Sequence, residues 1–120
     1  MHEFPITQQI IRIAEGKTRE AGASRVLAVS LVVGDQSGFI GDSIQMYFDA
    51  ISEGTCCEGA VLTITHVRPK LRCTACGLLF ERKPFSFACT GCGADGEPTE
   101  VGKEFYIDHI EVVPGGLDHD

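Results

Sequence analysis

Two matched cysteine motifs limit what this chain can fold into more than any other feature of its sequence. Each motif is a Cys-x-x-Cys-Gly turn, and the two copies are Cys73-Thr-Ala-Cys76-Gly77 and Cys89-Thr-Gly-Cys92-Gly93. One such turn presents two sulfur atoms to a metal ion, and two turns complete a tetrahedron of thiolates, the closed geometry of structural zinc. Glycine suits the position after each turn, because the chain must bend there, often at positive φ. We therefore expect Cys73, Cys76, Cys89 and Cys92 to hold one structural Zn(II).

Other uses of the same four cysteines fit the sequence less well. A redox dithiol needs one Cys-x-x-Cys at the start of a helix that follows a strand, rather than two matched turns. An iron site of the rubredoxin or iron–sulfur type uses similar ligands, so the ligands alone leave iron open. With four protein ligands no coordination position remains for a substrate, so we expect the ion not to be catalytic.

Composition and charge bound the class of protein. The chain has 120 residues, of which 43% are hydrophobic, enough to bury one core of moderate size. No apolar run approaches the length of a membrane span, and the first residues do not resemble a secretory leader. We therefore expect a cytoplasmic protein that does not bind membranes, and in the reducing cytosol six cysteines indicate metal binding rather than disulfides. The net charge of −7 opposes binding to nucleic acid.

The residues outside the cysteine motifs predict two helices and three strands. One helix is expected at 5–21, where Pro5 suits the first turn, and a second from a cap at Asp42 to a stop at Gly54. Strands are expected at 26–33, 60–67 and 103–113, where β-branched and apolar residues alternate. In these elements the inward positions are expected to be Ile6, Ile10, Ile13, Ala14, Leu27, Val29, Leu31, Val33, Ile44, Phe48 and Ile51.

These elements predict an α/β fold with two helices on a three-stranded mixed sheet. Residues 1–68 and 103–113 would form this domain. The segment 69–102 is rich in Cys, Gly and Pro and poor in β-branched residues, so it needs a metal to hold it together. We expect it to be an inserted zinc-ribbon-like module with four cysteine ligands, and we expect residues 114–120 to form a flexible tail.

The first residues, Met1-His2-Glu3, form a second candidate metal site. A free α-amine has a pKa near 8, so it can lose its proton at modest cost. The amine, the His2 amide nitrogen and the His2 imidazole can form adjoining chelate rings in one plane. Ni(II) and Cu(II) favour such planar nitrogen donors, whereas Zn(II) has no such preference. Taken alone, these residues are more simply explained as a solvated chain end with a histidine, and the combination with the rest of the chain favours the metal site.

In combination these features resemble the HypA/HybF family of hydrogenase-maturation nickel chaperones. The resemblance rests on the initial Met-His-Glu before an Ile-rich helix and on Gly34-Asp35-Gln36-Ser37-Gly38. It rests also on Glu53-Gly54-Thr55, on Glu58-Gly59-Ala60, on the two Cys-x-x-Cys-Gly turns and on the strand from Ile107 to Val113. Each piece is short, but their order and spacing are specific, and they cover residues 1–113.

The resemblance implies a function that spacing alone does not show. Members of the family bind Ni(II) at the N-terminus and pass it towards the large subunit of [NiFe]-hydrogenase, and they are not enzymes. By position, His2 would bind nickel through its side chain and backbone nitrogen, with the Met1 amine and the Glu3 backbone nitrogen completing the set. The Glu3 carboxylate would orient the site or contact a partner. The partners implied are a nickel-binding GTPase, the hydrogenase large-subunit precursor and, for some members, urease maturation proteins.

Several residues depart from the family pattern or stay outside it. Cys56-Cys57 stands where apolar or small residues are usual, and is read either as partly buried small residues or as an extra soft-metal or redox site. His66 and His109 fall in predicted strands, where structural or surface roles are expected, and His119 falls in the predicted tail. Half of the ten basic residues lie between Arg68 and Lys83. They are read either as solvated charges or as a docking face for an acidic protein.

Two other functions remain open at this point. One is a zinc-ribbon adaptor that binds another protein and has no role with nickel. The other is a small oxidoreductase that uses Cys56-Cys57 or one of the cysteine turns.

Overall fold

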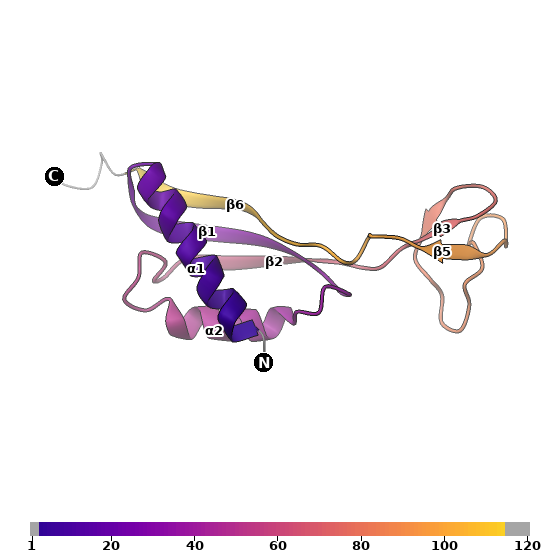
Figure 1. Cartoon of the computed structure of the whole chain (residues 1–120), viewed down its shortest axis with the longest axis horizontal. Helices are drawn as coiled ribbons and strands as arrows, with labels where there is room; N and C mark the ends of the chain where they lie inside the picture. The colour runs from indigo at the N-terminus through magenta and orange to yellow at the C-terminus, as the bar shows by residue number, and fades with distance from the viewer. Residues whose placement is uncertain (1–2, 115–120) are drawn as a thin grey trace.

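The computed structural model describes residues 3–114. They form an elongated molecule, 64 × 29 × 16 Å, with both helices at one end and a small sheet at the other (Figure 1). The elements in chain order are α1 Glu3–Glu20, β1 Ala23–Gly34, α2 Gly41–Ile51, β2 Val61–Val67, β3 Leu71–Cys73, β4 Leu79–Phe80, β5 Gly96–Pro98 and β6 Phe105–Pro114.

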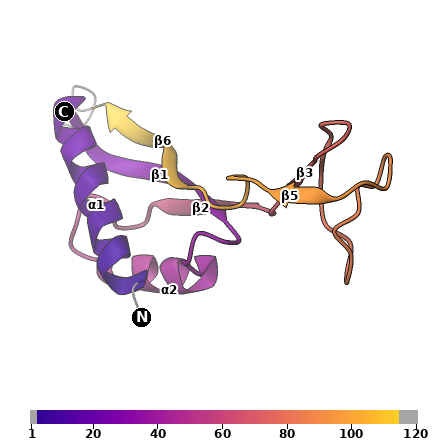
Figure 2. The ribbon, with the colours of Figure 1, turned by 45° about the vertical axis from the view of Figure 1, so that its right-hand side comes forward.

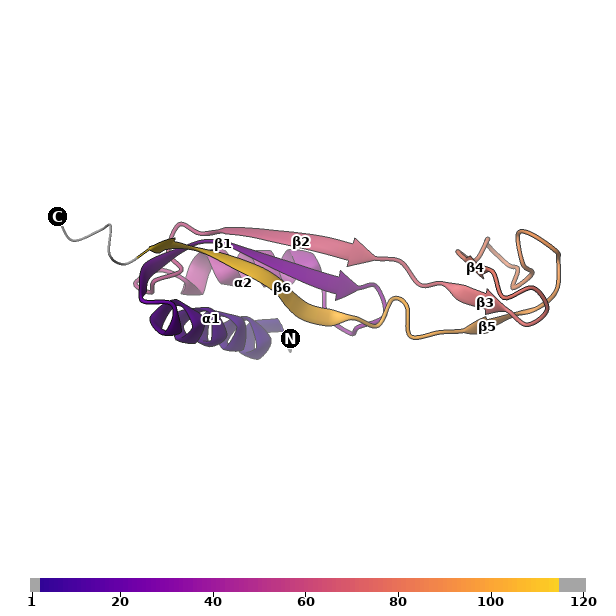
Figure 3. The same ribbon diagram turned by 90° about the horizontal axis from the view of Figure 1, so that it is seen from above.

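The larger sheet has the order β2-β1-β6, with β1 in the centre, as Figure 3 shows from above. Strand β1 pairs in parallel with β2 and antiparallel with β6, so the sheet is mixed. Helix α2 supplies the crossover between the two parallel strands, which cannot be joined by a tight turn. This arrangement confirms the predicted fold of two helices on a three-stranded mixed sheet.

The core lies between the sheet and the two helices. Figure 2 shows the start of α1 lying against α2, with both helices beside the sheet. The fully buried side chains of this core include Ile10, Ala14, Val29, Leu31, Val33, Ile44 and Phe48. These seven positions were predicted to face inward. Burying an aliphatic or aromatic side chain contributes about 1.5–3 kcal/mol each, so this cluster supplies the main stabilisation of the helical end.

Three local predictions were wrong. Leu27 is 44% exposed and Val26 takes its place in the core, because irregular pairing between β1 and β6 around these residues shifts the alternation by one position. Ile13 is 42% exposed, since the buried face of α1 is rotated towards Thr7 and Ile11. Helix α2 begins at Gly41 after an N-cap at Ile40, so Asp42 lies in the first turn and does not cap the helix.

The second sheet belongs to the cysteine module, the name used below for residues 69–102. Its order is β4-β3-β5, with all pairs antiparallel. These strands of two or three residues were not predicted. Leu71 and Phe80 are its buried large apolar side chains, packed with Cys73 and Cys89. A core this small cannot stabilise the segment by itself.

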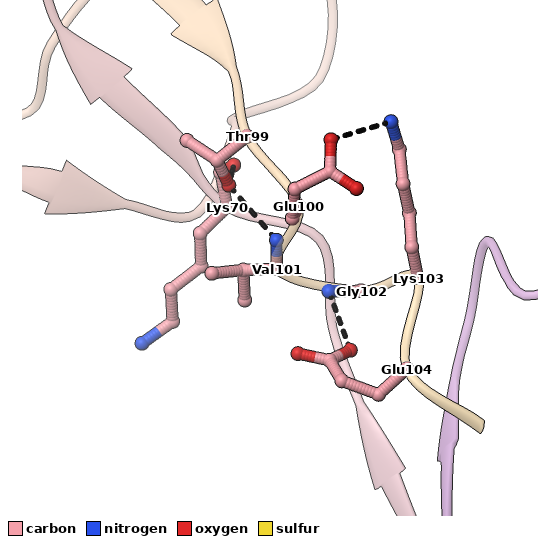
Figure 4. Close-up of polar contacts among 7 residues, drawn as sticks. All are labelled: Lys70, Thr99, Glu100, Val101, Gly102, Lys103 and Glu104. Atoms are coloured by element: carbon pink, nitrogen blue, oxygen red, sulfur yellow. Dashed lines mark hydrogen bonds and ion pairs between the residues drawn. The ribbon is translucent and has the colours of Figure 1, made fainter. Parts of the chain in front are cut away.

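The connection between the two sheets is held by hydrogen bonds around residues 99–104, and Figure 4 shows those of Thr99. Thr99 Oγ1 donates to the Lys70 carbonyl at 2.7 Å and accepts from the Val101 amide at 3.1 Å. The carbonyl groups of Gly102 and Glu104 accept from the amides of Gln36 and Gly34, each at 2.7 Å. The segment that returns from the cysteine module is therefore bonded both to its outgoing neighbour and to the loop after β1.

Candidate metal centre

The structure brings the sulfur atoms of Cys73, Cys76, Cys89 and Cys92 together, all within 4.8 Å of one another. Cys73 Sγ lies 3.4 Å from Cys92 Sγ, and Cys76 Sγ lies 3.7 Å from Cys89 Sγ. A tetrahedral zinc ion with Zn–S bonds of about 2.3 Å separates its sulfur ligands by about 3.8 Å. The four side chains therefore fit one tetrahedral ion with little adjustment.

Local backbone geometry directs amide groups towards these sulfurs. The amides of Ala75 and Cys76 donate to Cys73 Sγ at 3.3 Å, and the Gly91 amide donates to Cys89 Sγ at 3.2 Å. Gly77 and Gly93 have φ values of 77° and 84°, the left-handed conformation expected after each turn. Their own amides bond to the carbonyls of Cys73 and Cys89, which closes each turn.

The protonation of the ion-free cluster is uneven. The Cys76 amide holds the pKa of Cys73 down to about 6, and the pKa of Cys89 is also lowered by backbone amides, which outweigh its burial. The Leu78 amide favours the Cys76 thiolate, but the neighbouring sulfurs of Cys73 and Cys89 outweigh it and raise the pKa of Cys76 to about 11. Four adjacent thiolates repel one another, so two sulfurs hold their protons until a cation arrives.

Of the residues predicted to bind nickel, Met1 and His2 lie outside the described residues, and Glu3 is the first residue of α1. Glu3 is only 4% exposed. One of its carboxylate oxygens accepts a hydrogen bond from the Ile40 amide at 3.0 Å. The carboxylate therefore connects the start of α1 to the start of α2. No sequence pattern pointed to this contact, because the two residues are far apart in the chain.

Of the adjacent cysteines Cys56 and Cys57, the second does not have the properties of a reactive thiol. Cys57 is fully buried in the core of the helical end. Its burial, followed by the neighbouring Cys56, raises its pKa to about 12. A thiol that holds its proton at neutral pH is a poor nucleophile and a poor metal ligand. The half-buried Cys56 and the buried Cys57 fit the interpretation of this pair as partly buried small residues.

His66 and His109 do not belong to the cysteine cluster. His66 is exposed at the end of β2, with its ring beside Gly41, and a side chain at Gly41 would lie within 2.8 Å of that ring. His109 is exposed on β6, where Nδ1 contacts Asp108 at 3.0 Å and Nε2 contacts Ser30 at 3.2 Å. His119 lies outside the described residues. Among the helices of residues 3–114, none is long and apolar enough to cross a membrane.

An α/β domain joined to a separate four-sulfur cluster defines a small metal-binding protein of two parts. Comparison with known proteins identifies its family. Residues 1–112 match the family described as hydrogenase/urease nickel incorporation, metallochaperone, hypA. The chain therefore belongs to the HypA family of nickel-incorporation metallochaperones.

Individual relatives agree with this assignment. The chain is 39% identical over 113 residues to the hydrogenase maturation factor HypA of Caldanaerobacter subterraneus, and 40% identical over 112 residues to that of Geobacter metallireducens. Each match covers 93% of this chain and 99% of the relative.

Two solved structures share the fold. The solution structure of a HypA protein matches with a TM-score of 0.69 at 21% identity, covering 95% of this chain and 98% of that one. The solution structure of the nickel metallochaperone HypA from Helicobacter pylori matches with a TM-score of 0.61 at 20% identity, covering 92% and 97%.

Proposed function

We propose that this chain binds Ni(II) through its first three residues and delivers it for the maturation of [NiFe]-hydrogenase. The donors are the Met1 amine, the backbone and imidazole nitrogens of His2, and the Glu3 backbone nitrogen. Zn(II) at Cys73, Cys76, Cys89 and Cys92 has a structural role. The chain acts in the cytoplasm as a carrier, with no catalytic step of its own.

The observation that carries the nickel proposal is the position of Glu3. Its buried carboxylate accepts a hydrogen bond from the Ile40 amide. We therefore leave this carboxylate out of the proposed set of nickel donors. The proposed set then consists of nitrogen atoms only, which suits planar Ni(II). The site also adjoins the first turn of α1, an 18-residue helix whose positive N-terminal dipole favours deprotonated, anionic amide nitrogens.

A terminal site of this kind suits a carrier. Its donor nitrogens must lose or lack their protons to bind the metal, so protonation releases it. A partner can also replace the donors one at a time, because they belong to a chain end. The partners in this proposal are a nickel-binding GTPase and the hydrogenase large-subunit precursor. Urease maturation proteins are a second group of clients, since the family description includes urease.

The chemistry of the cysteine cluster supports Zn(II) in a structural role. Four thiolates close the coordination sphere, and their spacing matches a tetrahedral ion. The ion would replace the missing core of the cysteine module and remove the repulsion between its sulfurs.

The test is a Ni(II) titration of the zinc-loaded protein, followed by calorimetry and by the visible absorption of planar nickel. We expect wild type to bind one Ni(II), and His2→Ala to lose at least about 100-fold in affinity, because it removes the imidazole donor and the chelate ring that this donor closes, although the backbone nitrogen remains. His66→Ala and His109→Ala are matched controls that should bind as wild type does. Equal binding by wild type and His2→Ala would overturn the nickel site.

A second test addresses the terminal amine. Residues added before Met1 convert that amine into an amide, which should abolish the planar complex while leaving His2 intact. Unchanged affinity in the extended protein would remove the amine from the donor set. A chain that binds zinc but no nickel in either test would instead be a zinc-ribbon adaptor for protein interactions.

A further inference from the structure

The loop between β4 and β5 carries an aromatic residue in an unusual conformation. Phe85 is fully exposed, at 102%, and its φ of 60° makes it the only non-glycine residue with positive φ between residues 3 and 114. A bulky side chain in this conformation carries strain of order 1 kcal/mol. Burial within the chain does not compensate for the strain, and the exposed ring adds an unfavourable contact with water.

The ends of this loop are fixed, so its shape is defined. The Ser86 amide donates to the Lys83 carbonyl at 3.2 Å, which forms the turn that presents Phe85. The Ala88 amide donates to Ser86 Oγ at 3.1 Å, and the Gly96 amide donates to the Phe87 carbonyl at 2.8 Å. Phe85 is therefore held outward by a turn that is bonded to the small sheet.

The charged residues beside Phe85 are basic. Lys83 lies two positions before it, and the Arg82 guanidinium stacks 4.8 Å above the half-exposed ring of Phe87. The nearest acidic residue along the chain, Glu81, contacts Arg68 at 3.4 Å and so offsets a different cation. This local positive charge contrasts with the net charge of −7 for the whole chain.

A pocket of about 370 Å³ opens at the base of the loop. Phe87 and Arg82 line it from the loop, Arg68 and Lys70 from the outgoing connection, and Asp35 from the loop after β1. Glu81 also lines the pocket, so its charged lining consists of three basic residues, Arg68, Lys70 and Arg82, and two acidic ones, Asp35 and Glu81. A chain segment that contacts Phe85 and continues towards this pocket would therefore meet a rim with a small excess of positive charge beside the ring of Phe87.

We propose that residues 81–87 form a docking loop for an acidic protein surface. Phe85 enters an apolar pocket of the partner, and Arg82 and Lys83 pair with carboxylates around that pocket. An exposed aromatic anchor with flanking cations is typical of the centre and rim of a protein interface. Burial in the partner would offset the strain that the free loop holds. This inference rests on the proposed function for the choice of partner proteins to be tested.

The experiment measures binding of the full zinc-loaded chain to two purified proteins in separate titrations. One is the hydrogenase large-subunit precursor and the other is the nickel GTPase. Phe85→Asn removes the ring but suits positive φ, so zinc content and thermal stability should not fall. We expect it to weaken binding to one of the two proteins by about tenfold or more. Arg82→Glu with Lys83→Glu should weaken the same binding about tenfold at low salt and less at high salt, because salt screens charge pairs.

Matched controls are Tyr106→Ser and Lys17→Glu, an exposed aromatic and an exposed lysine at the helical end of the molecule. They should bind as wild type does. Equal binding of wild type and both loop variants to each protein would overturn the docking loop, as would a loss confined to the controls. Lack of binding by wild type to both proteins would also overturn it.

Two further measurements separate the alternatives. Vesicles containing phosphatidylglycerol test a membrane surface, and binding to them that Phe85→Asn abolishes would replace the protein partner by a membrane. Ni(II) titration of the same variants should match wild type. Failure of wild type to bind nickel would count against the proposed function. Normal nickel binding, together with loop variants that bind both proteins as wild type does, would count against the docking loop alone.

Discussion

At the scale of single residues, the carboxylate of Glu3 joins the N-terminal ends of the two helices. It accepts from the Ile40 amide at the N-cap of α2, where the Ile40 side chain offers no cap of its own. A negative charge at this end also interacts favourably with the helix dipole. We expect Glu3→Ala to destabilise the protein by about 1–3 kcal/mol, because it leaves a part-buried amide without its acceptor. Glu3→Gln keeps an acceptor and should lose about half as much. Urea denaturation with zinc bound measures both.

Glu20→Ala provides the comparison, since Glu20 lies at the far end of α1 and makes a solvent-exposed ion pair with Lys17. Its effect should be close to zero. A Glu3→Ala variant as stable as Glu20→Ala would show that the carboxylate contact does not hold the start of α1. Glu3→Gln should retain nickel binding, because the proposed donor of this residue is its backbone nitrogen.

Residue-level prediction succeeded where the signal is local. The cysteine turns could be recognised because ligand spacing and the glycine at positive φ are both set within about five residues. The contact of Glu3 could not be found, because its partner lies 37 positions away and is a backbone amide that any residue would offer. The strained Phe85 carries no sequence signal either, since a phenylalanine in a loop is ordinarily taken for a buried one.

At the scale of elements, the junction between β1 and the returning connection depends on close backbone approach. A Cβ at Gly34 would lie 2.1 Å from the Gly102 carbonyl oxygen, which is part of the backbone and cannot rotate away. We expect Gly34→Ala to destabilise the protein by about 2–4 kcal/mol, because it separates β1 from residues 102–104 and disrupts the hydrogen bonds between them. Thermal unfolding of the zinc-loaded variant measures the loss.

Gly16→Ala is the matched substitution. Gly16 lies within α1, and the nearest atom to its added Cβ is the flexible end of Arg19 at 4.0 Å. Alanine there should raise the stability by about 0.5–1 kcal/mol, since it has the higher helix propensity. Similar effects of the two substitutions would show that the junction tolerates displacement and is not defined by close packing.

Element-level prediction succeeded for long periodic segments. The inward positions of α2 were correct at Ile44 and Phe48, and the order of the two helices and of the three strands of the larger sheet was predicted correctly. The position of Leu27 failed because a register irregularity depends on the pairing with β6, which is set by tertiary structure. Strands β3, β4 and β5 were missed because segments of two or three residues are too short for a periodic pattern.

At the scale of the whole molecule, the two ends should respond differently to loss of the metal. Both helices and the larger core lie at one end, and the cysteine module buries few apolar side chains. We expect Cys73→Ser, or removal of zinc by a chelator, to unfold residues 69–102 while the helical signal in circular dichroism is largely retained. The amide resonances of β1 and α1 should shift little. Collapse of those resonances would show that the two parts fold as one unit.

The zinc affinity should fall at acid pH, and the number of protons released on binding should reflect the uneven protonation of the four cysteines. At neutral pH the Cys73 thiol, with a pKa of about 6, is mostly ionised before zinc binds, whereas Cys76, with a pKa of about 11, carries its proton. Zinc needs all four thiolates, so binding at neutral pH should release fewer than four protons, mainly from Cys76 and Cys92, whose pKa is also raised. As the pH falls through about 6, Cys73 takes up a proton as well, and the dependence of zinc affinity on pH should become steeper.

Calorimetry in buffers of different ionisation enthalpy measures the number of protons released when zinc binds. Release of one proton from every thiol at neutral pH, with a constant slope into the acid range, would show that the backbone amides do not favour ionised Cys73 in the ion-free site.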